Sequence, residues 1–142
     1  MSLFSSIQVS ASGMAAQRTR AEMLVENMAN TETTRTPEGG PYRRKDVVFT
    51  SDLQSSPFSA VFQNELAEGV RVAEVVQDQQ PPDMRYVPGH PDADANGMVR
   101  MPNVDTAREM VNLLVASRAY EANVAALQAS RKVAEASLNL AR

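Results

Sequence analysis

The stretch that decides the fold is residues 103–142, NVDTAREMVNLLVASRAYEANVAALQASRKVAEASLNLAR. Steps of alternately three and four residues from Met110 meet an apolar side chain at eight of ten positions. Those positions are Met110, Leu113, Ser117, Tyr120, Val124, Leu127, Arg131, Ala134, Leu138 and Ala141. This period is typical of a coiled-coil helix and differs from the two-residue period of a strand. The sequence therefore predicts one helix over about 104–141, roughly 55 Å long at the helical rise per residue.

The start of this helix is signalled by the residues after Pro102. Asn103, Asp105 and Thr106 are all residue types that accept backbone N–H bonds at a helix N-terminus. Thr106 and Glu109 also have the spacing of a capping box. We therefore expect a well-defined helix start within this short stretch.

Residues 1–36 repeat the pattern more weakly. Six of eight heptad positions are apolar, the exceptions being Ser10 and Gln17; the full set is Leu3, Ile7, Ser10, Met14, Gln17, Ala21, Leu24 and Met28. Four threonines between Thr31 and Thr36 are β-branched and favour helix poorly. The sequence predicts an N-terminal helix of roughly 40 Å that stops near Asn30.

The middle of the chain cannot be helical over any length. All eight prolines and five of the six glycines lie between Pro37 and Pro102, and proline in a helix interior removes a hydrogen-bond donor and clashes with the preceding turn. We expect three parts: a helix in 1–36, a β and loop domain in 37–102, and a helix in 103–142. The predicted fold class is α+β, with long N- and C-terminal helices forming a coiled-coil-like layer and a small β-rich middle domain.

Four short runs in the middle domain have strand composition. They are 47–49, 70–76 with Glu74 as an interruption, 84–87 and 98–101. Between 50 and 66, Phe58, Phe62 and Leu66 are spaced by four, which permits either a short helical turn or a loop.

Composition excludes several classes of protein. The net charge is −3 with a pI near 5.2, whereas nucleic-acid-binding domains usually carry a basic surplus. Without cysteine the chain has no disulfide, thiolate nucleophile or Cys-ligated metal. The longest apolar run is four residues, as at 113–116, and neither a membrane span nor a signal-peptide core is expected.

The two amphipathic helices imply a protein that assembles. Two helices can pair as an antiparallel hairpin or with other copies, and a hairpin with stripes this wide leaves apolar surface uncovered. Val111, Leu114 and Val115 widen the stripe of the C-terminal helix, which we expect to meet more than one neighbour. The expected assembly interface comprises Leu3, Ile7, Met14, Leu24, Met28, Met110, Leu113, Leu114, Tyr120, Val124, Leu127 and Leu138.

The loop PGHPDADANG, residues 88–97, is the main candidate for metal chemistry. Asp92, Asp94, Asn96 and Gly97 copy the first half of an EF-hand calcium loop, but the twelfth position is Asn103 instead of Glu. A tight turn leading into a strand is the preferred interpretation, because Asn-Gly tolerates positive φ. We therefore expect no metal and no cofactor.

Two other polar features have a functional and a structural interpretation. His90 is the only histidine, so an acid–base role would need Asp92 or Asp94 as its partner; a structural His is favoured. Arg43-Arg44-Lys45 is either a solvated turn, which we favour, or a set of ion pairs with acidic neighbours. A metal-dependent hydrolase using residues 90–94 stays a remote alternative, and no catalytic residue is expected.

Several motifs resemble bacterial flagellar proteins. SASGM at 10–14 and NMANT at 27–31 are similar to the opening of the axial rod and hook proteins, and the block over 86–123 is similar to the proximal-rod members. The matching positions include Asn27, Asn30, Pro88, Asp92, Asp94, Asn96, Gly97, Pro102, Asn103, Asp105, Arg118 and Asn123.

The resemblance implies a structural protein of the flagellar basal body. Members are not enzymes; they pass unfolded through the flagellar type III export apparatus and assemble helically into the rod that spans the periplasm. The implied partners are other copies, other rod proteins and the adaptor to the membrane ring, without nucleic acid or membrane insertion. Another rod or hook subunit is the alternative within the family.

Overall fold

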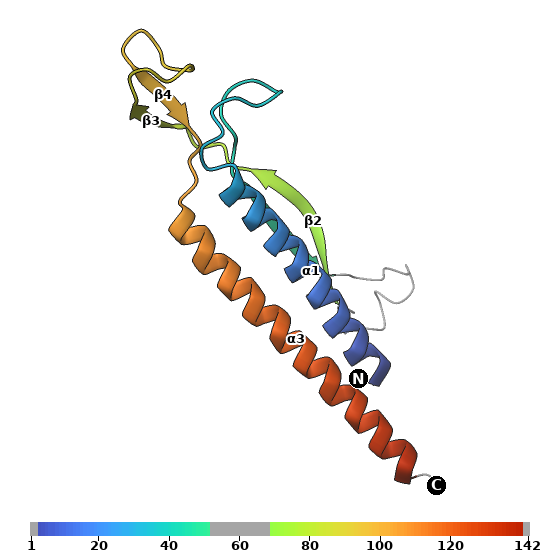
Figure 1. Cartoon of the computed structure of the whole chain (residues 1–142). Coiled ribbons are helices and arrows are strands. Elements are labelled where there is room, and N and C mark those ends of the chain that lie inside the picture. Colours follow the sequence, from blue (N-terminus) through green and yellow to red (C-terminus); the bar gives the residue numbers. More distant parts are fainter. Residues whose placement is uncertain (1–2, 52–68, 141–142) are drawn as a thin grey trace, which may run out of the picture.

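The computed structural model describes residues 3–51 and 69–140 (Figure 1). The described elements are α1 (Leu3–Ala29), β1 (Lys45–Ser51), β2 (Val70–Gln77), β3 (Asp83–Tyr86), β4 (Met98–Met101) and α3 (Thr106–Leu140). The α+β class, both long helices and the four strands agree with the sequence predictions. The segment with Phe58, Phe62 and Leu66 lies outside the described residues.

The two helices pack side by side as an antiparallel pair (Figure 1). Three contacts fix their register: Ser6 with Ser130, Gly13 with Asn123, and Asn27 with Glu109. Steps of seven and fourteen residues along α1 are matched by equal steps backwards along α3. The pair therefore keeps a heptad register over most of α1, as expected for a coiled-coil-like layer.

α1 ends at Ala29, where polar side chains also bond to its last carbonyls. The Asn30 Nδ2 donates to the Glu26 carbonyl at 2.9 Å, and the Thr31 hydroxyl donates to the Met28 carbonyl at 2.9 Å. The Glu26 carbonyl also accepts the backbone N–H of Asn30 at 3.1 Å, so these side-chain bonds add to the last backbone bonds of the helix. The predicted stop near Asn30 is confirmed, and the threonines act as caps as well as helix breakers.

α3 is capped by Asp105. One carboxylate oxygen of Asp105 accepts the backbone N–H groups of Ala107 at 3.0 Å and Arg108 at 3.2 Å. The expected capping box between Thr106 and Glu109 does not form, because the Glu109 side chain is fully buried and bonds elsewhere. The sequence prediction of a cap here is correct, and the predicted box is wrong.

The described strands form two separate two-stranded antiparallel sheets, β1–β2 and β3–β4. In the β1–β2 ribbon, Val48 pairs with Glu74 and Phe49 with Val72, so Ala73 bulges without a partner. The predicted interruption at Glu74 is thus a bulge beside it, and the strand continues to Gln77.

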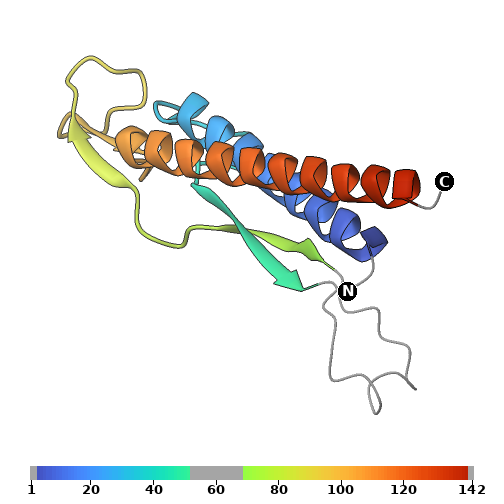
Figure 2. The ribbon, with the colours of Figure 1, turned by 90° about the horizontal axis from the view of Figure 1, so that it is seen from below.

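α1 is the middle layer of the molecule (Figure 2). It packs against α3 on one side and the β1–β2 ribbon on the other, while α3 packs on α1 alone among the described helices and strands. The ribbon is tied to α1 at both ends, by Lys45 to Asn27 and by Val70 to Ser12. α3 is consequently covered on one side only.

The interior contains few large apolar groups. Within the described residues, the largest fully buried side chains are Glu109, Val99 and Asn27, two of them polar. Leu24 and Ala116 are buried, and larger apolar residues such as Leu113 and Leu127 are only partly buried. None of the described helices is long and apolar enough to cross a membrane.

Candidate assembly interface

The side of α3 that faces away from α1 carries large apolar side chains in its first turns and mostly small or polar ones after them. Met110, Val111, Leu114 and Val115 are between 53% and 65% exposed. We define the outer face of α3 by the exposed residues Met110, Val111, Leu114, Val115, Arg118, Ala122, Ala125, Ala129, Val133 and Ala136. Alanines in the second half of this face permit close approach of another helix. The outer face therefore carries large apolar residues in its first half and mainly alanines in its second half.

α1 also presents apolar side chains to solvent. Phe4 is 84% exposed and Val25 is 49% exposed, and Val9 lies between them on the helix. These residues are covered by neither α3 nor the β1–β2 ribbon in the single chain. Both helices thus carry apolar surface beyond what one subunit uses.

The predicted interface residues fall into two groups. Met110, Leu114, Tyr120 and Leu138 are exposed, whereas Ile7, Met14, Leu24, Met28, Leu113, Val124 and Leu127 are partly or fully buried within the subunit. The side chain of Leu3 lies outside the described residues. Half of the predicted heptad frame is displaced by one residue, because Ser117 and Arg131 are exposed and Glu109, Ala116, Asn123 and Ser130 face α1. The other half, with Leu113 and Leu127, is partly buried as predicted.

A polar hub joins the two helices to the start of β1. We define the hub by Asn27, Tyr42, Arg44, Lys45 and Glu109. The Arg44 Nε donates to Glu109 Oε1 at 2.7 Å, and the Asn27 Nδ2 donates to Glu109 Oε2 at 3.1 Å. Both carboxylate oxygens of a side chain with 0% exposure are therefore paired.

The Asn27 amide uses its full hydrogen-bonding capacity. Its Nδ2 also donates to the Lys45 carbonyl at 2.8 Å, and its Oδ1 accepts from the Lys45 N–H at 2.9 Å and the Tyr42 hydroxyl at 3.0 Å. Two donors and two acceptor sites are all occupied. One buried side chain thus connects α1, the segment before β1 and α3.

The hub shifts the titration of two of its groups. Burial lowers the pKa of Arg44, but its hydrogen bond to and attraction by Glu109, together with Asp46, outweigh this effect and raise the pKa above its usual value. Burial, then the nearby carboxylates of Glu26 and Glu109, raises the pKa of Tyr42 to about 12. Both groups therefore keep their protons throughout the neutral range.

The basic cluster forms ion pairs, so the favoured solvated-turn interpretation is wrong for two of its three residues. Arg44 pairs with Glu109 and also with Asp46 at 3.2 Å, and the Lys45 Nζ lies 2.6 Å from Glu26 Oε1. Arg43 is exposed and donates to Gln79. The ion-pair interpretation is confirmed for Arg44 and Lys45.

The 88–97 loop is a turn, as preferred from the sequence. One carboxylate oxygen of Asp94 accepts the N–H groups of Asn96 at 2.8 Å and Met98 at 2.9 Å, and Gly97 has φ of 77°. Asp92 instead bonds to the Thr34 hydroxyl at 2.8 Å and pairs with Arg35 at 2.7 Å. The two carboxylates serve different structural contacts, and the described residues contain no group of three His, Cys, Asp or Glu side chains that could hold a metal.

His90 supports the same loop. Its Nδ1 accepts the Asp92 N–H at 3.1 Å, and its carbonyl accepts the Ala93 N–H at 3.0 Å. The favoured structural interpretation of His90 is confirmed.

The remaining motif residues are spread over the fold. Asn30 caps α1, Asp105 caps α3, Pro102 is buried, and Asn103 bonds to Gln80. Arg118 lies on the outer face of α3, and Asn123 packs against Gly13. Pro88 is exposed in the loop.

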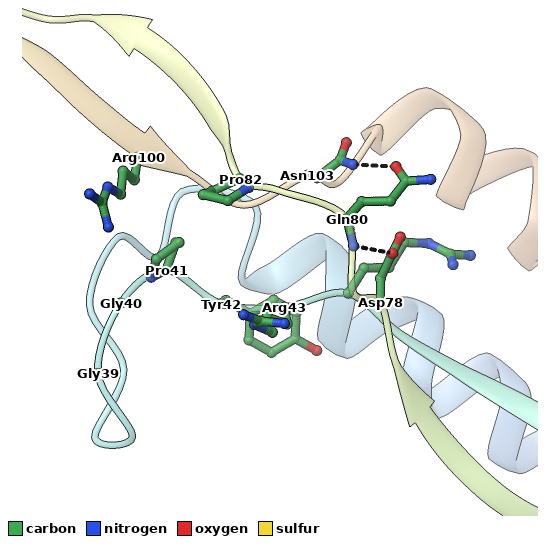
Figure 3. Close-up of a pocket in the computed structure, with 11 residues that line it drawn as sticks. Gly39, Gly40, Pro41, Tyr42, Arg43, Asp78, Gln80, Pro82, Arg100 and Asn103 are labelled. Atoms are coloured by element: carbon green, nitrogen blue, oxygen red, sulfur yellow. Dashed lines mark hydrogen bonds between the residues drawn. The ribbon is translucent and has the colours of Figure 1, made fainter.

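A hollow of about 360 Å³ lies beside the hub (Figure 3). The backbone of residues 39–43 forms one wall, and Asp78, Gln80 and Asn103 line another. Asn103 bonds to Gln80, and the Gln80 N–H bonds to Asp78, so these groups satisfy one another. The hollow presents no pairing of a nucleophile with a base.

Sequence reasoning missed the role of Glu109. Its capping-box spacing offered a local explanation, and the apolar count favoured the frame that begins at Met110. The available signal was the heptad Glu109, Ala116, Asn123 and Ser130, whose small and polar residues suit a close, hydrogen-bonded helix contact.

Comparisons with known proteins agree with this architecture. The family model described as flagellar basal body rod FlgEFG protein C-terminal matches residues 95–140. The chain is 40% identical to flagellar basal-body rod protein FlgC of Borreliella burgdorferi, with 97% of each chain covered. It is 41% identical to FlgC of Salmonella typhimurium over 99% of this chain and 98% of that one. It is also 40% identical to FlgC of Bacillus subtilis over 92% of this chain and 93% of that one. The chain therefore belongs to the FlgC family, as a structural, non-enzymatic subunit of the proximal rod in the flagellar basal body.

Proposed function

We propose that the outer face of α3 is the main surface through which this subunit joins its neighbours in the rod. The observation that supports it is the exposure of Met110, Val111, Leu114 and Val115 on a helix that packs on one side only among the described elements. Fully burying an exposed apolar side chain of this size releases about 1.5–3 kcal/mol, and side chains that are 53–65% exposed would gain about half of that each. Four such residues from each of many subunits supply a large part of the assembly energy.

In this proposal the helices and the middle domain have separate roles. Residues 1–36 and 103–142 form the inner helical layer of the shaft, and 37–102 forms an outer domain. The exposed Phe4, Val9 and Val25 of α1 give a second apolar surface, so one subunit contacts neighbours through two faces. Torque then passes through many helix contacts of moderate strength.

The partners follow from the family. Assembly with other rod subunits is implied by membership; contacts with further copies of this chain, with the adaptor to the membrane ring, and with the type III export apparatus in transit are part of the proposal. Helical assembly across the periplasm belongs to it as well.

The test is a charge placed on the outer face. Leu114→Asp should abolish swimming in a strain that lacks its own copy, because the carboxylate would be buried against a neighbour. Leu114 is 65% exposed in the single chain, so the helix content of the purified variant should be unchanged.

Ser137→Asp is the matched control, since it adds the same charge at an exposed position of α3 outside the outer face. It should leave swimming close to wild type. Normal swimming of Leu114→Asp would contradict the proposal, and equal loss in both variants would show that any added charge on α3 is harmful.

A further inference from the structure

We propose that the polar hub is a register lock: it selects the one alignment of α3 on α1 in which Asn27 and Arg44 both reach Glu109. The proposal concerns pairing within one subunit and goes beyond the use of the outer face of α3. It rests on the burial of Glu109, the pairing of both its oxygens, and the character of the remaining helix contact.

The seam between the helices specifies register poorly without the hub. Its contacts include Ser6 with Ser130 and Gly13 with Asn123. Small side chains form shallow knobs and holes, and partly buried apolar residues such as Leu113 and Leu127 can pack in more than one heptad register, so packing alone selects the alignment less strictly than the hub. The Oε1 of Gln17 is buried and has no hydrogen-bond partner within the described part of the chain, so it contributes no hydrogen bond to the choice of register.

A shift of α3 along α1 by one heptad would remove the partners of Glu109 in the hub. A seven-residue shift in one direction places Glu109 opposite Thr34, beyond the end of α1 at Ala29. The opposite shift places it opposite Arg20, which offers a charge but neither the Asn27 amide nor Arg44. A buried carboxylate that loses its partners is strongly unfavourable, which is how single polar residues fix coiled-coil register.

Most residues of the hub are close to one another in the sequence, whereas Glu109 is far from them. Asn27, Tyr42 and Lys45 are within 18 residues of one another along the chain, and their bonds close a short loop. Glu109 is 82 residues from Asn27. Because short loops close at low entropic cost, the local half forms a ready receptor, with Arg44 beside it, to which α3 then docks.

Engineered cysteines can report the register directly, because the chain has none of its own. Ser6→Cys with Ser130→Cys reports the native register, since the two hydroxyl oxygens are 3.3 Å apart. Ser6→Cys with Asn123→Cys or with Ser137→Cys reports a slip of one heptad in either direction. Each pair is placed in the full chain, and disulfide yields are compared under mild oxidation at low protein concentration.

The lock is then removed with Glu109→Gln, and weakened with Arg44→Lys, which keeps the charge but changes the hydrogen-bond geometry. The ratio of native to slipped cross-links should fall about tenfold in Glu109→Gln, and by less in Arg44→Lys. Glu135→Gln is the matched control, because it removes an exposed ion pair to Arg131 on the same helix and should leave the ratio unchanged.

An unchanged ratio in both hub variants would overturn the lock, even if both lower stability. Failure of the chain with Ser6→Cys and Ser130→Cys to form this disulfide while its hub is intact would overturn the lock as well. The outcome is separable from the proposed function: Leu114→Asp should keep the wild-type ratio while losing swimming, whereas Glu109→Gln should change the ratio in the purified chain.

Discussion

Individual residues in this protein matter mainly through the polar groups that they keep satisfied. Asn27 fills all four of its hydrogen-bonding positions, and both oxygens of Glu109 are paired although the side chain is fully buried. A buried polar group without a partner costs about 1–3 kcal/mol, so a network of this kind stabilises only when complete. The hub residues are therefore the positions at which conservative substitutions should be least tolerated.

Tyr42 should make the free energy of unfolding depend on pH in the alkaline range. Its pKa is about 12 in the folded chain against 10.0 for an ordinary tyrosine, so between these values the folded state holds a proton that the unfolded state has released. The stabilisation from Tyr42 should be complete below pH 10 and decline as the pH rises towards 12. We expect the free energy of unfolding to fall more steeply over this window in the wild type than in Tyr42→Phe.

The measurement is urea unfolding at a series of pH values for both chains, together with the difference in tyrosinate absorbance between them. That difference should titrate near pH 12. A titration near the ordinary value would show that the Tyr42 hydroxyl is not held in the hub.

Two constraints oppose a side chain at Gly97, the backbone conformation and a close neighbour, whereas only the backbone conformation opposes one at Gly89. Both have positive φ, 77° and 94°, but a Cβ on Gly97 would also lie 2.8 Å from the Tyr86 ring, whereas a Cβ on Gly89 would meet nothing within 4 Å. Gly89→Ala should cost about 1–2 kcal/mol from backbone strain alone, and Gly97→Ala should cost more. Thermal unfolding of the two variants measures the difference; equal losses would mean that the ring moves aside freely.

At the scale of elements, the contact between α1 and α3 is close and narrow. Gly13 allows this approach, because a Cβ there would lie 3.0–3.2 Å from the side-chain atoms of Asn123. Glycine in a helix interior is otherwise unfavourable by about 1 kcal/mol relative to alanine. The sequence gives up helix stability at this point in exchange for proximity to Asn123.

A double-mutant cycle tests this account of Gly13. Gly13→Ala alone should be neutral or destabilising, since the added methyl group meets the Asn123 amide. In the background of Asn123→Ala the same change should stabilise by about 1 kcal/mol, because only the gain in helix propensity remains. Urea unfolding of the four chains gives the coupling energy, and a stabilising effect of equal size in both backgrounds would exclude the close contact.

The element order was predictable from the sequence because its signals are local. The distribution of prolines predicted the three parts of the chain, runs of strand-favouring residues predicted the strands, and Asp94 with Gly97 specified the turn that the structure contains. The seam was only half predicted: the heptad positions of Leu113 and Leu127 are partly buried as expected, but the alternate positions begin one residue earlier, at Glu109, because the count of apolar residues favoured Met110. The hub could not be predicted, since the 82-residue separation of Asn27 and Glu109 leaves no local pattern.

At the scale of the whole molecule, the three layers are covered by their neighbours to different extents. α1 is covered by α3 and by the β1–β2 ribbon, whereas α3 is covered by α1 alone among the described elements. In the register set by Ser6 and Ser130, the part of α3 after Val133 also has no described residue of α1 opposite it. The single chain thus leaves the end of α3 with little tertiary support.

A dilute chain should therefore show less helix than the 27 and 35 residues of α1 and α3. Helices without an apolar partner are marginal in water, so the deficit should lie in the last turns of α3 and disappear on assembly. Circular dichroism with amide hydrogen exchange, on a sample shown to be monomeric by sedimentation, measures both. Complete helicity with protected amides beyond Val133 would contradict the prediction.

The antiparallel pairing also decides where a reporter group can be attached. The N-terminal end of α1 and the C-terminal end of α3 lie towards one end of the molecule, and the β3–β4 hairpin lies at the other (Figure 1). In the proposed assembly, an epitope or fluorophore at either terminus would lie within the inner helical layer. Gly89 lies in the β3–β4 loop, is exposed and has open space around its Cα. A small tag inserted there would remain accessible to an antibody while swimming is preserved.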